Sequence, residues 1–123
     1  MVVTISTKYS FYFRQRLELL KSFKPYNKLR PRELDLLAGL QHSYFKCISS
    51  LKVIPEQEEL DSMVFNSVTF DRLRGDLSMS EYVLNNNKMG LRNMEFLSKT
   101  GLKKEYVVDP DKESTLTFNF IIS

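Results

Sequence analysis

The stretch from Phe70 to Leu91, "FDRLRGDLSMSEYVLNNNKMGL", decides the expected fold. Apolar residues at helical spacing predict a short helix over residues 67–77. Ser80 is a favourable N-cap, because its hydroxyl can accept a hydrogen bond from the first unpaired backbone amides of a helix. We therefore expect a second helix over residues 80–98, separated from the first by a tight turn at residues 78–79.

Two further helices are expected on the N-terminal side of this pair. Apolar residues from Tyr9 to Phe23 recur at helical spacing, and Pro25 ends that helix. The next helix begins at Pro31, where the missing amide of proline costs little, and its apolar face runs from Leu34 to Leu51. The segment 56–61 is acidic, and we expect a loop or a single helical turn there.

The C-terminal part of the chain predicts a β-hairpin. Residues 102–108 and 114–122 are strand-like, and in the second segment apolar and polar residues alternate with the period of a half-buried strand. The sequence "DPDKE" between them is rich in turn-forming residues. Gly101 is expected to supply the left-handed residue that closes the helix over 80–98.

This order of helices, tight turn and hairpin resembles the winged helix-turn-helix fold. The resemblance covers residues 29–122, in which "LRPRELDLLAGL" is similar to the first helix and residues 102–122 correspond to the wing. The residues that match the family's turn and second helix are Leu77, Ser78, Met79, Ser80 and Leu84. The implied fold is mainly α with a small β-hairpin. Its winged core covers residues 29–123, and residues 1–28 add an arm and a basic amphipathic helix.

More narrowly, the chain resembles small proteins of large tailed phages that share a Leu-x-Pro-x-Glu-Leu opening and an Asn-Asn pair in the second helix. Two positions depart from the winged pattern. The family usually has glycine where this chain has Ser78, and a serine or threonine cap where Arg30 precedes Pro31. Serine can adopt the left-handed conformation, although at a higher cost than glycine.

The resemblance implies DNA binding, with the helix over 80–98 as the recognition helix in the major groove. If Leu84 and Leu91 face inward, the outward face offers amides suited to adenine and cations suited to guanine or phosphate. The candidate DNA-binding or partner-binding residues are Tyr82, Asn85, Asn86, Lys88, Met89, Arg92, Lys103, Lys104 and Lys112. Asn87 is expected to face partly inward, where it would bond the edge of the core.

The first 32 residues hold eight basic residues and one acidic residue. Arg14, Lys21 and Lys28 recur at seven-residue spacing, close to two helical turns, and Lys24 lies between the last two. We expect these side chains to form a stripe that lies along phosphates or docks on an acidic partner. The aromatic face of the same helix needs either the core or a neighbouring subunit to cover it, so we also expect a homo-oligomer.

Two functions remain open at this point. The first is a phage transcriptional regulator that binds double-stranded DNA in the host cytoplasm. The alternative is a virion component, such as an adaptor, ring or capsid-associated protein, that contacts other virion proteins through the winged helix. Neither is an enzyme.

Catalytic and cofactor-binding signatures are missing from the sequence. Its four glycines are scattered and form no phosphate loop. His42 and Cys47 lie about 140° apart around one expected helix, and no metal-ligand spacing is found. We therefore expect no enzymatic activity, cofactor, metal ion or small-molecule substrate. No apolar run approaches the about 20 residues of a membrane span, and no secretory signal is visible, so an intracellular location is expected.

Overall fold

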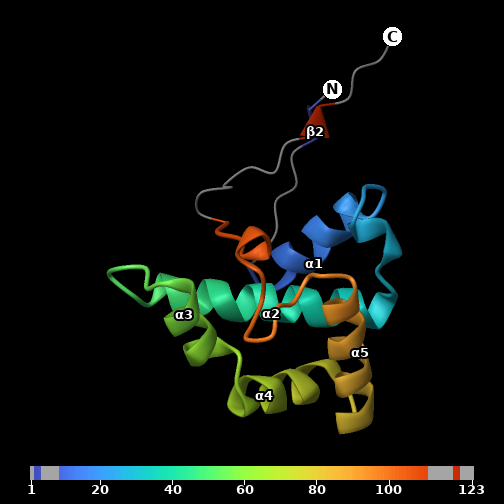
Figure 1. The fold of residues 1–123 in the computed structure, drawn as a ribbon. Helices are drawn as coiled ribbons and strands as arrows, with labels where there is room; N and C mark the ends of the chain where they lie inside the picture. The colour runs from blue at the N-terminus through green and yellow to red at the C-terminus, as the bar shows by residue number, and fades with distance from the viewer. Residues whose placement is uncertain (1, 4–8, 111–117, 120–123) are drawn as a thin grey trace.

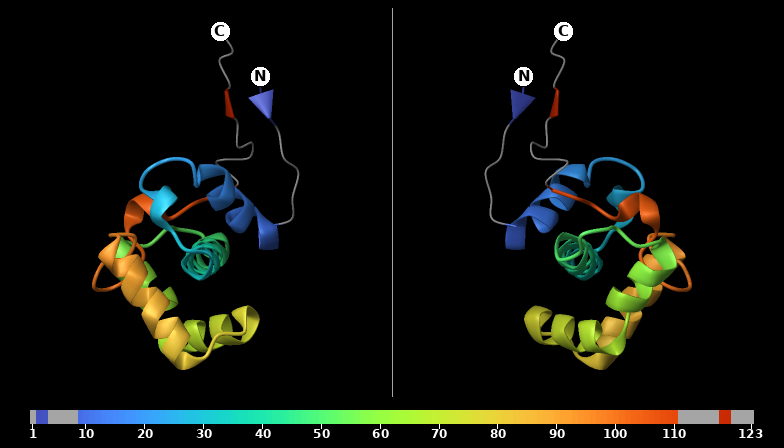
Figure 2. Two further views of the ribbon diagram at one scale, coloured as in Figure 1. Left: turned by 90° about the vertical axis from the view of Figure 1, so that its right-hand side faces the viewer. Right: turned by 90° about the vertical axis from the view of Figure 1, so that its left-hand side faces the viewer.

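The computed structural model describes residues 2–3, 9–110 and 118–119, and shows a bundle of short helices around one central helix (Figure 1). The α-helices of this part of the chain are α1 (Tyr9–Leu20), α2 (Pro31–Ser49), α3 (Gln57–Val64), α4 (Ser67–Leu77) and α5 (Glu81–Asn93). Two 3-10 turns, η1 (Tyr26–Lys28) and η2 (Lys104–Tyr106), and two short strands, β1 (Val2–Val3) and β2 (Phe118–Asn119), complete the elements. The other α-helices pack around α2 (Figures 1 and 2).

The hydrophobic core is centred on α2, which is buried around most of its circumference, as expected for a helix that neighbours cover on several sides. From α1, Phe13 and Leu17 are completely buried, so the N-terminal helix packs on α2 within the same core. The other buried apolar residues are Leu29, Leu34, Leu36, Leu37, Ala38, Leu40, Tyr44, Phe45, Leu60, Val64, Phe70, Leu73, Met79, Leu84, Leu91, Phe96, Leu97, Leu102 and Val108.

The predictions for the tight turn are confirmed. Helix α4 covers the predicted range, and Ser78 then adopts the left-handed conformation, with φ 53° and ψ 46°. Met79 is buried, and the Ser80 hydroxyl accepts a hydrogen bond from the backbone N–H of Val83 at 3.2 Å. Serine therefore occupies the position that a glycine would take most easily.

The end of α5 differs from the prediction. The helix stops at Asn93, and the left-handed residue that closes it is Glu95, with φ 67°. The backbone N–H of Phe96 then donates to the carbonyl of Leu91 at 2.9 Å, which satisfies one of the last helical carbonyls. Gly101 has no positive φ. It is a glycine for another reason, since a Cβ there would overlap the Asp61 carboxylate.

The predicted β-hairpin is wrong, and with it the winged helix-turn-helix fold class. Residues 102–108, expected to be a strand, contain the 3-10 turn η2, and Leu102 forms only an isolated bridge with Leu97 among the described residues. Strand β2 pairs antiparallel with β1 at the other end of the chain, with Val2 opposite Asn119. The remaining parts of the predicted second strand, 114–117 and 120–122, lie outside the described residues.

Side chains of α2 and α3 take the hydrogen bonds that a strand partner would have made. Gln41 donates through Nε2 to the carbonyl of Tyr106 at 3.0 Å, and Gln57 donates through Nε2 to the carbonyl of Leu102 at 3.1 Å. The backbone N–H of Leu102 donates to the hydroxyl of Tyr44 at 3.1 Å. The segment after α5 therefore packs on helices, which satisfies its buried polar backbone without a sheet.

The acidic segment is also more ordered than predicted, because it begins the two-turn helix α3. Leu60 and Val64 bury one face of α3. Asp61 is only 5% exposed and accepts hydrogen bonds from the Tyr44 hydroxyl at 2.5 Å and from Gln57 Nε2 at 3.0 Å. The Thr100 hydroxyl donates to the same carboxylate at 3.3 Å. The prediction of a loop or a single helical turn is wrong, because Leu60 and Val64 pack in the core and the buried Asp61 carboxylate bonds Tyr44.

Candidate nucleic-acid interface

Helix α5 is held against the start of α2 at Gly90. A Cβ at this position would overlap the Glu33 carboxylate, so glycine lets the two helices approach closely. Glu33 is 2% exposed, accepts a hydrogen bond from the backbone N–H of Arg30 at 2.9 Å, and contacts the Arg30 guanidinium at 3.2 Å. The same pairing caps the N-terminus of α2, where the helix dipole favours a carboxylate. One buried acid thus fixes both the start of α2 and the position of α5.

The outer face of α5 carries one continuous exposed stripe. Each of its residues has another member three or four positions away, which places them along one side of the helix. They are Tyr82, Asn85, Asn86, Met89 and Arg92, all from the sequence-predicted set. Tyr82 is 76% exposed and Met89 is 60% exposed. The structure therefore brings these five candidates together on the surface.

Asn87 behaves as predicted and is not part of this stripe. Its side chain is buried at the core edge, and its Nδ2 donates to the carbonyl of Val83 at 2.8 Å. The three consecutive asparagines consequently divide into Asn85 and Asn86, which face solvent, and Asn87, which bonds the helix backbone.

Lys88 is placed differently from the other candidates. Its ammonium lies 4.0 Å from the centroid of the Phe70 ring and 5.6 Å from that of Phe65, within a cavity of about 340 Å³ between α4 and α5. Burial, together with the nearby charge of Arg92, lowers the pKa of Lys88. This lysine therefore stabilises the contact between the two helices through a cation–π interaction. The interaction joins residues far apart in the sequence, which helical spacing alone does not reveal.

Lys104, one of the lysines assigned to the predicted wing, does not lie beside the exposed stripe on α5. Lys104 lines a cavity of about 470 Å³ with Ile54 and Leu60, near α3, and Figure 1 shows α3 and α5 at opposite ends of α2. The backbone N–H of Lys103 donates to the carbonyl of Phe96, so this residue follows the same packed segment. Lys112 lies outside the described residues. Without the predicted hairpin, Lys104 lies away from the exposed stripe on α5 (Figure 1).

The basic stripe predicted for the N-terminal helix is also corrected. Helix α1 ends at Leu20, so Lys21, Lys24 and Lys28 follow the helix and do not share its face with Arg14. The backbone N–H of Lys21 still bonds the carbonyl of Glu18, but the chain then turns toward η1. The seven-residue spacing therefore reflects no common helix.

Arg14 itself faces α2. Its Nε lies 2.6 Å from a carboxylate oxygen of Asp35, and its Nη1 lies 2.9 Å from a carboxylate oxygen of Glu18. The pair with Asp35 joins α1 to α2, and the pair with Glu18 lies within α1. Arg14 therefore stabilises the packing of these helices.

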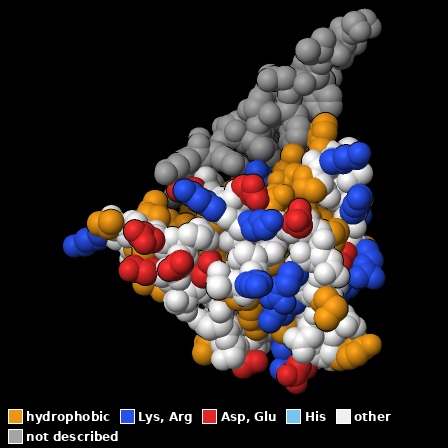
Figure 3. All heavy atoms as spheres, viewed as in Figure 1, with side chains coloured by type: hydrophobic (Ala, Val, Ile, Leu, Met, Phe, Trp, Pro, Cys, Tyr) orange, Lys and Arg blue, Asp and Glu red, His pale blue; other side chains and the backbone are white. Residues whose placement is uncertain are grey.

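Two of the N-terminal lysines lie beside the C-terminal end of α5. Lys24 and Lys28 line a depression of about 320 Å³ together with Asn93, Met94 and Glu95. Figure 3 shows Lys and Arg side chains along the edge of the molecule where the α1–α2 connection meets α5. The connection between α1 and α2 thus places cations beside α5, where the sequence had placed those of a wing.

Sequence reasoning missed Arg30 and Arg32 as neighbours of this surface. Arg32 donates through Nη2 to the carbonyl of Leu77 at 2.6 Å, which ties the start of α2 to the turn before α5. Arg30 lies beside Gly90 through its pairing with Glu33. Both arginines flank Pro31 at the start of α2, which α5 approaches. This position was the sequence signal that could have identified them.

The described part of the chain holds no group of three His, Cys, Asp or Glu side chains placed to bind a metal ion. The helices found in it are too short or too polar to cross a lipid bilayer. Cys47 is half-buried, with its Sγ 3.8 Å from the sulfur of Met63, and His42 stacks on Phe13 with ring centroids 5.3 Å apart.

Comparisons with protein-family models, with curated proteins and with solved structures find no match for this chain.

Proposed function

We propose that this protein binds double-stranded DNA, with α5 in the major groove. The observation that carries the proposal is the exposed stripe on α5, set at the surface by a capped helix that follows a tight turn. A major groove about 12 Å wide accepts an α-helix, and Asn side chains can form two hydrogen bonds with adenine. Asn85 and Asn86 would read bases, in the role of a transcriptional regulator that the phage resemblance implies.

The cations around the stripe support contacts with the phosphate backbone. Arg92 lies on the stripe itself, and Lys24 and Lys28 lie at its C-terminal end. Each of these side chains is exposed, so it can neutralise a phosphate without losing an internal partner of the core. Because its ammonium lies over the Phe70 ring, Lys88 supports binding indirectly, by holding α4 and α5 together.

A second candidate function uses the same stripe for protein contacts. Tyr82 and Met89 are large, exposed and on either side of the two asparagines, and such residues are frequent at interfaces. In that case the protein is an assembly component of a virion, in contact with other virion proteins. Mass spectrometry of purified particles would then find the chain in abundance, and the isolated protein would not bind duplex DNA.

The DNA proposal is tested by fluorescence anisotropy with random-sequence duplexes at two salt concentrations, followed by selection of a preferred site. Asn86→Ala should weaken the preference between sites, and Lys28→Ala should weaken all sites alike and reduce the salt dependence. Lys104→Ala is the matched control, because Lys104 lies near α3 and should leave binding unchanged. If the protein binds no duplex at low salt, the proposal is wrong.

A further inference from the structure

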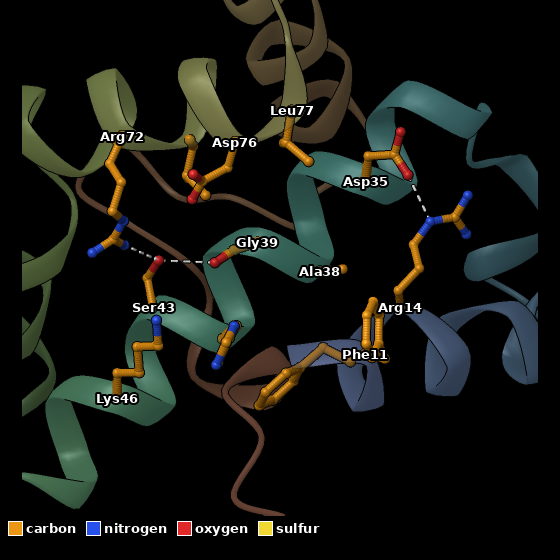
Figure 4. Close-up of a pocket in the computed structure, with 13 residues that line it drawn as sticks. Phe11, Arg14, Asp35, Ala38, Gly39, Ser43, Lys46, Arg72, Asp76 and Leu77 are labelled. Carbon is orange, nitrogen blue, oxygen red and sulfur yellow. Dashed lines mark hydrogen bonds and ion pairs between the residues drawn. The ribbon is translucent and has the colours of Figure 1, made fainter. Parts of the chain in front are cut away.

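Helices α1, α2 and α4 surround a cavity of about 430 Å³ that none of the residues of α5 lines (Figure 4). This volume falls within the range of small-molecule sites, roughly 300–1,000 Å³. The cavity is therefore separate from the candidate DNA-binding stripe and needs its own explanation.

One wall of the cavity is apolar. Phe13 and Leu73 are buried in the core and present their side chains from α1 and α4, and Ala38 lies between them on α2. Phe11 also lines the cavity and is 58% exposed, which is unusual for a phenylalanine. An apolar group that entered here would cover this ring and remove it from water.

A second part of the lining is cationic. Lys46 from α2 and Arg72 from α4 converge on this side, and His42 precedes Lys46 by one helical turn. Arg72 donates through Nη2 to the Ser43 hydroxyl at 2.7 Å, and that hydroxyl donates to the carbonyl of Gly39 at 2.9 Å. Within the described residues, neither Lys46 nor Arg72 forms an ion pair with a carboxylate. An anionic group would therefore gain two charged donors that have no acidic partner among the described residues.

Two acids also line the cavity, and they do not neutralise its positive charge. Asp35 is held by Arg14 at 2.6 Å and by Arg32 at 3.1 Å, on the side of the cavity away from Lys46. Asp76 lies one helical turn after Arg72 on α4. Because the lining also includes three cations, its formal charge at neutral pH stays positive when His42 is neutral.

His42 provides a reporter inside the cavity. Burial, followed by the charges of Lys46 and Arg72, lowers its pKa below the usual 6.5. A bound anion near the same two cations would offset their charge and raise that pKa. His42 is the single histidine of the chain, so its ring protons are readily identified by NMR.

We propose that this cavity binds a small amphipathic organic anion, with its carboxylate or phosphate at Lys46 and Arg72 and its apolar body against Phe11 and Leu73. The site adds a ligand to a chain whose sequence suggested no small-molecule substrate. It shares no residue with the DNA-binding stripe, so either proposal can fail without the other.

The proposal is tested by following the His42 ring protons during titration with four probes. Phenylacetate and phenyl phosphate carry both an apolar ring and an anionic group. Benzyl alcohol lacks the charge, and acetate lacks the ring.

We expect a saturable shift and a raised His42 pKa with at least one of the two amphipathic anions, and the anion that binds more tightly identifies the preferred head group. Benzyl alcohol should bind at least about tenfold more weakly, because it loses the charged hydrogen bonds. Acetate should also bind at least about tenfold more weakly, because it buries almost no apolar surface. No saturable shift with either anion, or equal binding of benzyl alcohol, overturns the proposal.

Two arginine variants of α4 separate the cavity from general charge effects. Arg72→Gln should weaken binding of the preferred anion by about tenfold, because it removes a charged donor. Arg74→Gln is the matched control, since Arg74 lines the cavity between α4 and α5 instead. Both variants should keep the dispersed NMR spectrum of the folded chain. Equal affinity of the Arg72→Gln variant and the unmodified protein would refute the assignment.

Discussion

The ammonium of Lys88 lies 4.0 Å from the centre of the Phe70 ring, so a lysine that helical spacing assigns to DNA stabilises the helix pair instead. Lys88→Ala should lower the free energy of unfolding by about 1 kcal/mol, through the lost cation–π contact and the lost packing of the lysine stem. Chemical denaturation measures this change.

Arg92→Ala is the matched comparison for Lys88→Ala, because Arg92 lies one turn further along α5 and is exposed. If the proposed function holds, Arg92→Ala should reduce the slope of log affinity against log salt by about 1, whereas Lys88→Ala should leave that slope unchanged. A slope that falls for Lys88→Ala and not for Arg92→Ala would contradict this division of roles.

Gly90→Ala should destabilise the protein, because the new methyl group would overlap the buried Glu33 carboxylate. The carboxylate would have to leave the backbone N–H of Arg30, at a cost of about 1–3 kcal/mol. Thermal and denaturant unfolding provide the measurement. Gly75→Ala is the control, because a Cβ there meets no atom within 4 Å, and the better helix propensity of alanine should stabilise α4 by about 0.5–1 kcal/mol.

A double variant tests the mechanism behind Gly90→Ala. If the clash with Glu33 is the cause, the effects of Gly90→Ala and Glu33→Ala should not add, since the second substitution removes the atoms that the first displaces. Strict additivity would show that the glycine is needed for another reason.

Local signals in the sequence predicted α4, the start of α2 and α5, and the exposed stripe. The cap at Ser80 and the spacing of Leu84 and Leu91 fix both the start of α5 and its rotation, so Asn85 and Asn86 had to face outward. These features depend on residues within a few turns of one another, which periodicity and capping rules describe directly.

The errors that change the fold and the site involve contacts between distant parts of the chain. The segment 102–108 is apolar enough for a strand, but Gln41 and Gln57 take its carbonyls and it packs on helices. Because the wing is absent from the described residues, Lys104 lies away from the stripe on α5. The bend after α1 places Lys28 near the end of α5. Whether a strand-like segment forms a strand depends on which segment packs beside it, and a single sequence does not identify that segment.

Ser78→Gly should stabilise the protein by about 0.5–1 kcal/mol. Ser78 occupies the left-handed region, with φ 53°, where a Cβ is strained and glycine is not. Part of the gain is lost because glycine is more flexible in the unfolded chain. Denaturant unfolding should show a higher midpoint for this variant. The comparison is Ser80→Ala, which removes the cap on Val83 and should cost about 1 kcal/mol.

Tyr44→Phe should lower stability by about 2 kcal/mol, because one hydroxyl serves two buried groups. It donates to Asp61 and accepts from the backbone N–H of Leu102, so its removal takes a partner from both. The control is Tyr82→Phe, which alters a hydroxyl on a 76% exposed side chain and should change the free energy of unfolding by less than about 0.5 kcal/mol. Similar losses in the two variants would exclude the proposed role of Tyr44.

The last prediction concerns the dependence of stability on pH through His42. Burial, then the charges of Lys46 and Arg72, hold its pKa in the folded chain below the unfolded value of 6.5. Between these two values the unfolded chain binds more protons than the folded chain, so stability falls as the pH is lowered from 6.5 toward the folded pKa. Above pH 6.5 the histidine is neutral in both states and makes no such contribution. His42→Gln should therefore lose less stability than the unmodified protein when the pH falls from 7.5 to 5.5, as measured by denaturant unfolding at each pH. Identical pH profiles for the two proteins, or an NMR titration of His42 centred above pH 6.5, would contradict the prediction.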